Sequence, residues 1–174
     1  MNPFVDAFVS IRDFFEAGGN VLYGILFVTV LMWTFIIERI WFFYFLLPKR
    51  IEEVNQAWHA RHDTTSWYAS QVRAGLISEV RIESRRFLLL IKTLMAVLPL
   101  LGLLGTVTGM IAVFDVMAFA GTGNARLMAA GVSKATIPTM SGLVAALSGL
   151  YFAAWLEKKA TVEVDRVEGL LVHH

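Results

Sequence analysis

The sequence predicts an all-α integral membrane protein with three transmembrane helices. Of its 174 residues, 57% are hydrophobic and the mean hydropathy is +0.63, whereas a soluble domain has about 45–50% apolar residues. Three apolar stretches lie at residues 21–47, 88–118 and 135–156, and a membrane-crossing helix needs about 20 residues of this kind. The last two stretches flank a short Gly-rich connection, so we expect them to form a hairpin.

Composition excludes several other classes of protein. The formal net charge of +1 provides no field for nucleic acid or for an acidic substrate. The chain has no Cys, which excludes disulfides, Cys-ligated zinc, iron–sulfur clusters and thiol nucleophiles. It has neither a phosphate-binding loop nor a His and carboxylate cluster with site spacing, so we expect no enzyme activity, no metal and no cofactor. Asp6, Asp13 and Glu16 accompany Arg12 where a cleaved signal peptide would be basic, so no such peptide is expected.

Residues 1–20 are predicted to form a short amphipathic helix on the outer face of the membrane. Its apolar side chains recur at spacings of 4, 3 and 4, which is one helical face, at Phe4, Phe8, Ile11 and Phe15. The helix is too short to span a bilayer. It lies either in the membrane interface or on the protein's own core. Gly18, Gly19 and Asn20 are expected to end it.

Residues 21–47 are predicted as transmembrane helix 1. Its uncharged part ends at Glu38 and Arg39 and is slightly shorter than a bilayer requires. We therefore expect these two residues to lie near an interface, or to pair with each other or with a neighbour. The aromatic run 41–44 fits an interfacial belt, and Pro48 marks the exit from the membrane.

Residues 48–87 are predicted as a cytoplasmic helical region. Residues 63–66 (Asp-Thr-Thr-Ser) form a turn or helix-start signal. From Ile77 onward no helix breaker precedes the second span, which predicts one continuous helix entering the membrane. His59 and His62 are three residues apart, but a metal site needs more ligands, so we expect a solvated pair.

The second half of the chain is divided by its two remaining spans. Transmembrane helix 2 is predicted over 88–118, an outer-face loop over 119–134, transmembrane helix 3 over 135–156 and a cytoplasmic helical tail over 157–174. The tail has an apolar stripe at spacings of 4, 3 and 4, which continues the third span into a helix bundle, at Ala160, Val164, Val167 and Leu171.

Basic residues predict the orientation of the chain. Region 48–87 has seven Lys and Arg and the tail has three, whereas the N-terminal segment has only Arg12 and the 119–133 connection only Arg126. Basic flanking segments stay in the cytoplasm. The N-terminus is therefore expected outside and the C-terminus inside.

Small residues follow one face of each helix in the predicted hairpin. In the second span they recur at spacings of 3, 4 and 3, at Gly102, Gly105, Gly109 and Ala112. In the third span they recur at alternating spacings of 4 and 3, at Ala135, Thr139, Gly142, Ala146, Gly149 and Ala153. Such faces let helix backbones approach closely in lipid, so we expect the two helices to pack against each other.

Hydroxyl side chains lie within the same two spans, at Thr106, Thr108, Thr136, Thr139, Ser141 and Ser148. Each hydroxyl either bonds a carbonyl one turn back in its own helix or lines a polar cavity. Pro99 and Pro138 favour the second alternative locally, because each removes a backbone donor and frees a carbonyl.

Asp115 and Lys134 fall near the outer ends of adjacent helices, where we predict an ion pair or a shared polar site. A Lys near a helix N-terminus opposes the helix dipole, so a nearby acid would offset that cost. No carboxylate lies in the middle of the second or third span. A chain that relayed protons alone would be expected to have one, so the sequence suggests half of a pathway: a hydroxyl-lined surface whose titrating acid comes from another subunit.

Two stretches carry a resemblance to a known family. One is Pro99-Leu-Leu-Gly-Leu-Leu-Gly-Thr-Val-Thr-Gly109, and the other runs from Gly131-Val-Ser-Lys-Ala-Thr-Ile-Pro-Thr139 through Met-Ser-Gly-Leu-Val-Ala-Ala146. They resemble paired motifs of the MotA/TolQ/ExbB proton channel family, nearest to ExbB. One position departs from the pattern, because many ExbB-like proteins have Glu where Lys134 stands.

The resemblance implies a homo-pentamer in the bacterial inner membrane. Its second and third spans would line a pore that holds an ExbD-like single-span partner, whose membrane aspartate carries the proton. Thr106 and Thr139 match the family's pore threonines, and Thr108, Thr136 and Ser141 are further candidates for partner contact. A TonB-like protein would pass the work to the outer membrane. A TolQ-like subunit and a structural scaffold without ion conduction remain alternatives; a stand-alone transporter is disfavoured because no internal repeat occurs.

Overall fold

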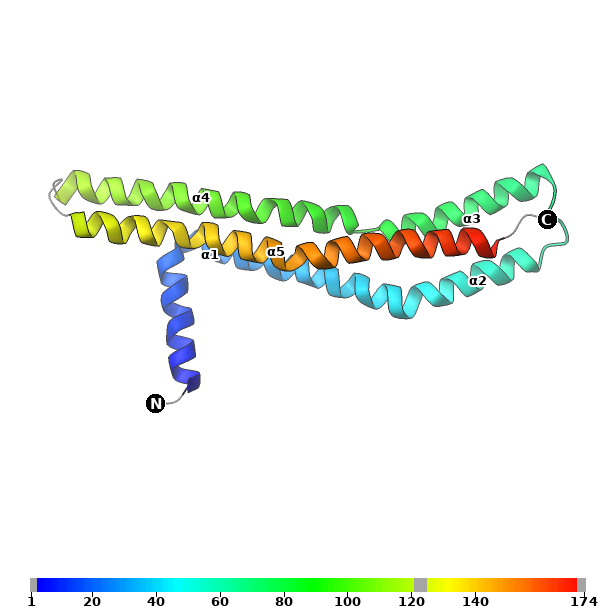
Figure 1. Cartoon of the computed structure of the whole chain (residues 1–174), viewed down its shortest axis with the longest axis horizontal. Coiled ribbons are helices and arrows are strands. Elements are labelled where there is room, and N and C mark those ends of the chain that lie inside the picture. The colour runs from blue at the N-terminus through cyan, green and yellow to red at the C-terminus, as the bar shows by residue number, and fades with distance from the viewer. Residues whose placement is uncertain (1–2, 121–124, 172–174) are drawn as a thin grey trace. The chain divides into compact units, whose positions relative to one another are not determined.

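A computed structural model describes residues 3–120 and 125–171, and all six elements in these residues are helical (Figure 1). Five are α-helices and one is a π-helix. They are α1 (Pro3–Trp41), η1 (Phe42–Leu46, the π-helix), α2 (Leu47–His59), α3 (Trp67–Arg85), α4 (Leu88–Ala120) and α5 (Ala125–Leu170).

Three stretches of the described residues are long and apolar enough to cross a membrane. They are Gly18–His59, Trp67–Phe119 and Met128–Leu170, each with an 18-residue window whose mean hydropathy is 2.1, 2.4 and 1.4 respectively. The predicted all-α class and the predicted number of spans are confirmed at this level. The chain divides into two compact units: residues 1–32 with 93–150 form unit 1, and residues 33–92 with 151–174 form unit 2.

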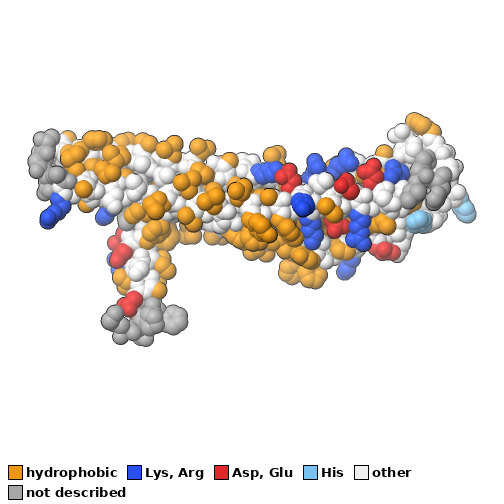
Figure 2. Space-filling view, viewed as in Figure 1, with side chains coloured by type: hydrophobic (Ala, Val, Ile, Leu, Met, Phe, Trp, Pro, Cys, Tyr) orange, Lys and Arg blue, Asp and Glu red, His pale blue; other side chains and the backbone are white. Residues whose placement is uncertain are grey.

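The surfaces of the two units differ in chemistry. In Figure 2 hydrophobic side chains are spread over α4 and the first half of α5, most of which belong to unit 1. Large apolar side chains on these helices are exposed, among them Leu103, Ile111 and Val144. Lys, Arg, Asp and Glu gather over α3 and the second half of α5, which belong to unit 2. Exposed apolar surface of this extent is expected where lipid or other subunits cover a protein.

In unit 1, α1 contains a break at Gly19. Its φ of 65° and ψ of −166° lie outside the helical region, and only glycine adopts this conformation readily. The segment before Gly19 turns away from the segment after it (Figure 1). On the predicted apolar face, Phe8 is 71% exposed and Ile11 is also exposed, whereas Phe15 is half-buried, with its ring 5.1 Å from that of Tyr23. The side chain of Phe4 lies outside those that the structure describes.

In unit 2, the helix of the first span continues past its predicted exit. Pro48 has no N–H and its ring crowds the carbonyl of Tyr44, four residues earlier. Around Tyr44 the helix widens into the π-helix η1 and then continues as α2. Such a local widening is a recognised way for a helix to pass a residue that cannot donate the regular hydrogen bond.

The turn between α2 and α3 is built by Asp63 and Ser66, as residues 63–66 predict. Ser66 is the N-cap of α3, and its hydroxyl oxygen accepts from the N–H of Ala69 at 3.1 Å. Asp63 accepts from the hydroxyl and the N–H of Ser66 and from the N–H of Thr65. The hydrogen bond from the Ser66 hydroxyl holds the pKa of the Asp63 carboxyl below its usual value.

The predicted continuous helix from Ile77 into the second span is wrong. α3 ends at Arg85 and α4 begins at Leu88, with Phe87 at a φ of 64°. The reason is a tertiary contact. Arg39 is 3% exposed, and its Nη1 donates to the carbonyl of Glu83 at 3.0 Å in the last turn of α3. The rings of Phe35 and Phe87 also meet, with centroids 5.2 Å apart.

Glu38 and Arg39 pair with each other, as one of the sequence alternatives predicts. Nε and Nη2 of Arg39 each donate to a different oxygen of Glu38 at 2.6 Å. A buried guanidinium is tolerated when its donors are matched in this way.

The connection between α4 and α5 is shorter than the predicted 119–134 loop, because residues 125–134 are helical. This segment begins Ala-Arg-Leu-Met-Ala-Ala, which are strong helix formers, and the end of an apolar run does not by itself end a helix. At its other end α5 continues to Leu170, and the predicted stripe of the tail is buried at Ala160, Val164, Val167 and Leu171.

The break at Phe87 predicts opposite orders of stability at two positions. Phe87→Gly is expected to be more stable than Phe87→Ala by about 1 kcal/mol, because only glycine adopts a positive φ without cost. At Ile82, which is 69% exposed in α3, the order should reverse by about 1 kcal/mol, since glycine weakens a helix interior. Thermal unfolding of the four variants in detergent measures both differences. The same order at both positions would contradict the break.

Candidate functional site

The backbones of α4 and α5 meet in unit 1 at their glycines. A Cβ placed on Gly102 would lie 2.9 Å from the Cα of Thr139, and one on Gly142 would lie 2.5 Å from the carbonyl oxygen of Leu98. A Cβ on Gly109 would lie 2.9 Å from the Cβ of Ala135. These distances leave no room for a side chain, so glycine is required for this approach.

The same faces extend the contact to α1. A Cβ on Gly105 would overlap the ring of Pro138 and lie 3.2 Å from a methyl of Val21. A Cβ on Gly149 would lie 2.7 Å from the sulfur of Met32. Of the small residues predicted to pack, Ala146 is half-buried. Three helices therefore pack together in unit 1 through positions that have little or no side chain.

The close approach brings Thr106 of α4 and Thr139 of α5 into direct contact. Their hydroxyl oxygens are hydrogen-bonded to each other. Both hydroxyls also reach the carbonyl of Gly102, from Thr139 at 3.0 Å and from Thr106 at 3.3 Å. Thr139 can reach this carbonyl because Gly102 has no side chain in the way.

Proton accounting shows what this Thr106–Thr139 pair can do. Each hydroxyl has one hydrogen to donate and can also accept. If Thr139 donates to Gly102, then Thr106 donates to Thr139; in the other arrangement Thr106 donates to Gly102 and Thr139 donates to Thr106. Both side chains are partly exposed. A third polar group that arrives can therefore donate a hydrogen bond to a threonine oxygen directly, whereas it can accept one only when a hydroxyl hydrogen leaves the Gly102 carbonyl or the other threonine.

The other candidate hydroxyls do not join this pair. Thr108 donates to Leu104 and Gly105 of its own helix at 3.0 and 3.1 Å. Thr136 donates to Ser133 at 2.7 Å, and Ser141 donates to Ile137 at 2.8 Å. These three follow the alternative in which a hydroxyl bonds one turn back in its own helix, so among these candidates the interhelical polar contact is confined to Thr106 and Thr139.

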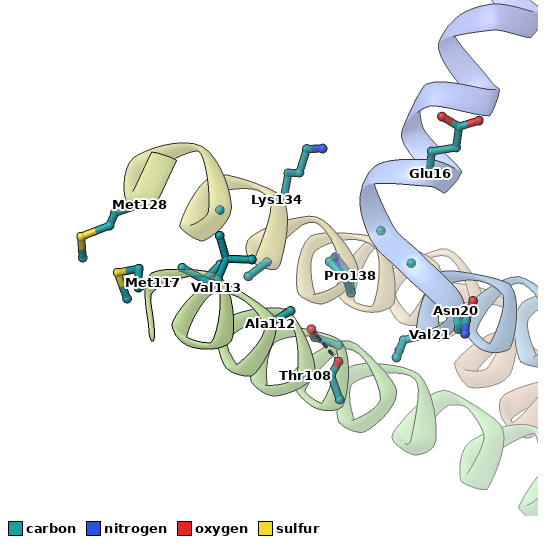
Figure 3. A pocket seen from close by; sticks show the side chains of 17 residues that line it. Glu16, Asn20, Val21, Thr108, Ala112, Val113, Met117, Met128, Lys134 and Pro138 are labelled. Carbon is teal, nitrogen blue, oxygen red and sulfur yellow. Dashed lines mark hydrogen bonds between the residues drawn. The ribbon is translucent and has the colours of Figure 1, made fainter. Parts of the chain in front are cut away.

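A cavity of about 620 Å³ lies in unit 1 between the part of α1 around Gly19, the second half of α4 and the first part of α5. Its lining is mainly apolar, with Thr108 and Lys134 among the polar residues (Figure 3). Asp115 is exposed and is not part of the lining. None of the ion pairs in the described residues joins Asp115 to Lys134, so that predicted pair is not formed; in Figure 3 Lys134 projects from α5 and Glu16 from α1.

The ion pair between α4 and α5 was not predicted from the sequence. In unit 2, the Nζ of Lys92 donates to both carboxylate oxygens of Glu157 at 2.8 Å. Lys92 lies near the start of the apolar run 88–118, and Glu157 directly follows the end of the run 135–156. In an antiparallel hairpin these two positions have the same depth, which could have indicated the pair. Both side chains are about half exposed, so the pair is expected to contribute at most about 1 kcal/mol.

The fold and the close-packed helices define a multi-pass helical membrane protein whose second and third spans meet at a polar contact. Residues 49–169 match the MotA/TolQ/ExbB proton channel family. This match covers most of the chain, which therefore belongs to that family.

Two relatives from Synechocystis sp. are similar to the chain. The "Putative biopolymer transport protein ExbB-like 3" is 42% identical over 71 residues, which are 40% of this chain and 34% of the relative. The "Putative biopolymer transport protein ExbB-like 1" is 31% identical over 170 residues, covering 79% of this chain and 67% of the relative. The chain thus spans about a third of the first relative and two thirds of the second.

The helix contact predicts a contrast between two glycines. Gly142→Ala should destabilise the protein by about 1–3 kcal/mol, because the new methyl meets the Leu98 backbone, which cannot move aside. A Cβ placed on Gly24 in α1 has no atom within 4 Å. Gly24→Ala should therefore be neutral or stabilise the helix by up to about 1 kcal/mol. Chemical unfolding in mixed micelles distinguishes the two, and equal effects would show that α4 and α5 do not meet at Gly142.

The threonine pair predicts an interaction energy that a double-mutant cycle can measure. Combining Thr106→Val with Thr139→Val should reveal a coupling of about 0.5–1 kcal/mol, the size typical of hydrogen bonds between membrane helices. Thr29, whose hydroxyl bonds Ile25 in its own helix at 2.7 Å, provides the control. Thr29→Val should be additive with Thr106→Val, and a cycle with no coupling between Thr106 and Thr139 would contradict the pair.

Proposed function

We propose that this chain is the ExbB-like subunit of a proton-driven machine in the bacterial inner membrane. The observation that carries the proposal is the contact of Thr106 with Thr139 beside the Gly102 carbonyl. Membership of the proton channel family supports it. The N-terminus faces outward, and residues 48–87 and the tail 157–174 lie in the cytoplasm, where their basic residues favour them.

The pathway requires an acid from a second chain. Between Lys92 and Asp115, and between Lys134 and Glu157, the sequence has no Asp or Glu. Hydroxyls relay hydrogen bonds, but they do not titrate at physiological pH. An ExbD-like single-span partner with a membrane aspartate would provide the missing group, held in a pore that α4 and α5 of a homo-pentamer line.

The threonine pair can distinguish the two protonation states of such an aspartate. An ionised carboxylate only accepts hydrogen bonds, so it would draw a hydroxyl hydrogen away from the Gly102 carbonyl. A protonated acid donates, so it would bond to a threonine oxygen and leave the hydroxyl hydrogens on Gly102 and on each other. Each proton transfer would thus rearrange the hydrogen bonds at the helix contact. A TonB-like protein would carry the resulting movement of the partner to the outer membrane.

The proposal is tested with Thr139→Val in cells that contain the partner proteins. A hydrogen bond to a charged group contributes about 1.5–3 kcal/mol, so energy-dependent uptake should fall roughly ten- to hundredfold. Pentamer assembly, followed by size-exclusion chromatography with light scattering, should be unchanged. Thr29→Val removes a hydroxyl that bonds within α1 and should leave uptake intact. Full uptake by an assembled Thr139→Val protein would favour a structural scaffold instead.

A further inference from the structure

A second cavity lies in unit 2, on one face of the helix formed by α1, η1 and α2. Its volume is about 450 Å³, and the end of α3 closes its other side. We refer to it as the basic groove, because four of its nine lining residues are basic: Arg39, Lys49, Arg50 and Arg86. Its three acidic residues are Glu38, Glu53 and Glu83, and its two apolar residues are Phe42 and Leu46.

The acids of the groove are already paired with two of its basic residues. Glu38 is bound by Arg39 through two hydrogen bonds of 2.6 Å. Glu53 and Glu83 both lie against Arg50, at 3.2 and 3.7 Å. The acidic side chains therefore offer little to a further cation, and the charge that is left in the groove is positive.

Lys49 and Arg86 are the basic residues left over. Neither forms an ion pair within the described parts of the chain, and both side chains are exposed. The guanidinium of Arg86 lies 4.9 Å from the ring centroid of Phe87, and this contact with an uncharged ring leaves its positive charge uncompensated. Two uncompensated cations in one groove form a site for an anion with several acceptor oxygens, such as a phosphate.

The position of the groove in the sequence indicates a lipid phosphate. Arg39 directly follows Glu38 at the end of the apolar run 21–37, and Arg86 stands two residues before the apolar run that begins at Leu88. The hydrogen bond from Arg39 to the Glu83 carbonyl, 3.0 Å long, holds these two boundaries together. In a membrane protein both boundaries lie at the depth of the headgroups, and basic pockets there bind acidic lipids.

The surroundings of the groove fit an amphiphile better than a soluble ion. Phe42 and Leu46 place apolar surface between the charged residues. Trp41, Tyr44 and Phe45 are exposed on the same stretch of helix, and aromatic residues are enriched at the membrane interface. We propose that the basic groove binds an anionic phospholipid, with Lys49 and Arg86 on its phosphate and with Phe42 and Leu46 against the first part of its acyl chains.

The test counts bound lipid on the full-length protein. The protein is purified from mixed micelles that contain phosphatidylglycerol, and native mass spectrometry measures the retained lipid. Lys49→Gln with Arg86→Gln should lower the apparent affinity for phosphatidylglycerol by roughly tenfold or more, the effect expected of two basic side chains at an anionic surface. The matched control is Arg61→Gln with Arg81→Gln, which removes two exposed charges outside the groove and should retain the lipid.

Two outcomes would show that binding is due to surface charge or to a soluble anion rather than to a lipid in the groove. Equal losses in the two double variants would overturn the proposal, because general surface charge would then account for binding. Displacement of the lipid by inorganic phosphate or by a polyglutamate peptide would assign the groove to a soluble anion or an acidic protein segment, and would likewise overturn it.

The single variant Lys49→Gln guards against a loss of lipid that is caused by misfolding. Lys49 is exposed and takes part in none of the ion pairs among the described residues, so its replacement should leave the circular dichroism spectrum unchanged. The folded variant should still lose lipid, and full retention of phosphatidylglycerol would refute the site.

Discussion

The contact of α4 with α5 at Gly102 and Gly142 is the constraint on which unit 1 depends. In lipid there is little hydrophobic gain in bringing two apolar helices together, so van der Waals contact and interhelical hydrogen bonds must hold them. Glycine allows that contact because a Cβ at either position would meet backbone atoms within 3 Å. The threonine pair follows from it, since Thr139 reaches the Gly102 carbonyl only where the two backbones are this close.

The end of α3 and the start of α4 depend on a different interaction. In unit 2, Arg39 is buried with Glu38 on one side and the Glu83 carbonyl on the other. This arrangement satisfies a guanidinium that would otherwise be costly to bury, and it ends α3 at the point where the next apolar helix begins. The same residue forms one wall of the basic groove, so the start of the second span and the shape of the groove have a common cause.

The parts of the fold that repeat along one helix could be predicted from the sequence. Apolar length predicted three membrane-crossing helices, and the stripe at Ala160, Val164, Val167 and Leu171 predicted a buried face, because both depend only on helical periodicity. The ends of helices were harder to predict from the sequence. Nothing in the residues near Phe87 breaks a helix, and the break arises from Arg39, which lies far away in the sequence.

For the candidate site, residue type and spacing were enough to predict the small-residue faces and the set of hydroxyls, and the resemblance of two stretches to known motifs predicted the family. Which hydroxyls act together depends on the tertiary structure. Thr108, Thr136 and Ser141 bond within their own helices, whereas Thr106 and Thr139 bond across two. Among the described residues, folding also left Asp115 and Lys134 without an ion pair and joined Lys92 to Glu157. The physical reason is that a partner on another helix depends on how the two helices are rotated and shifted, which the spacing along one helix does not specify.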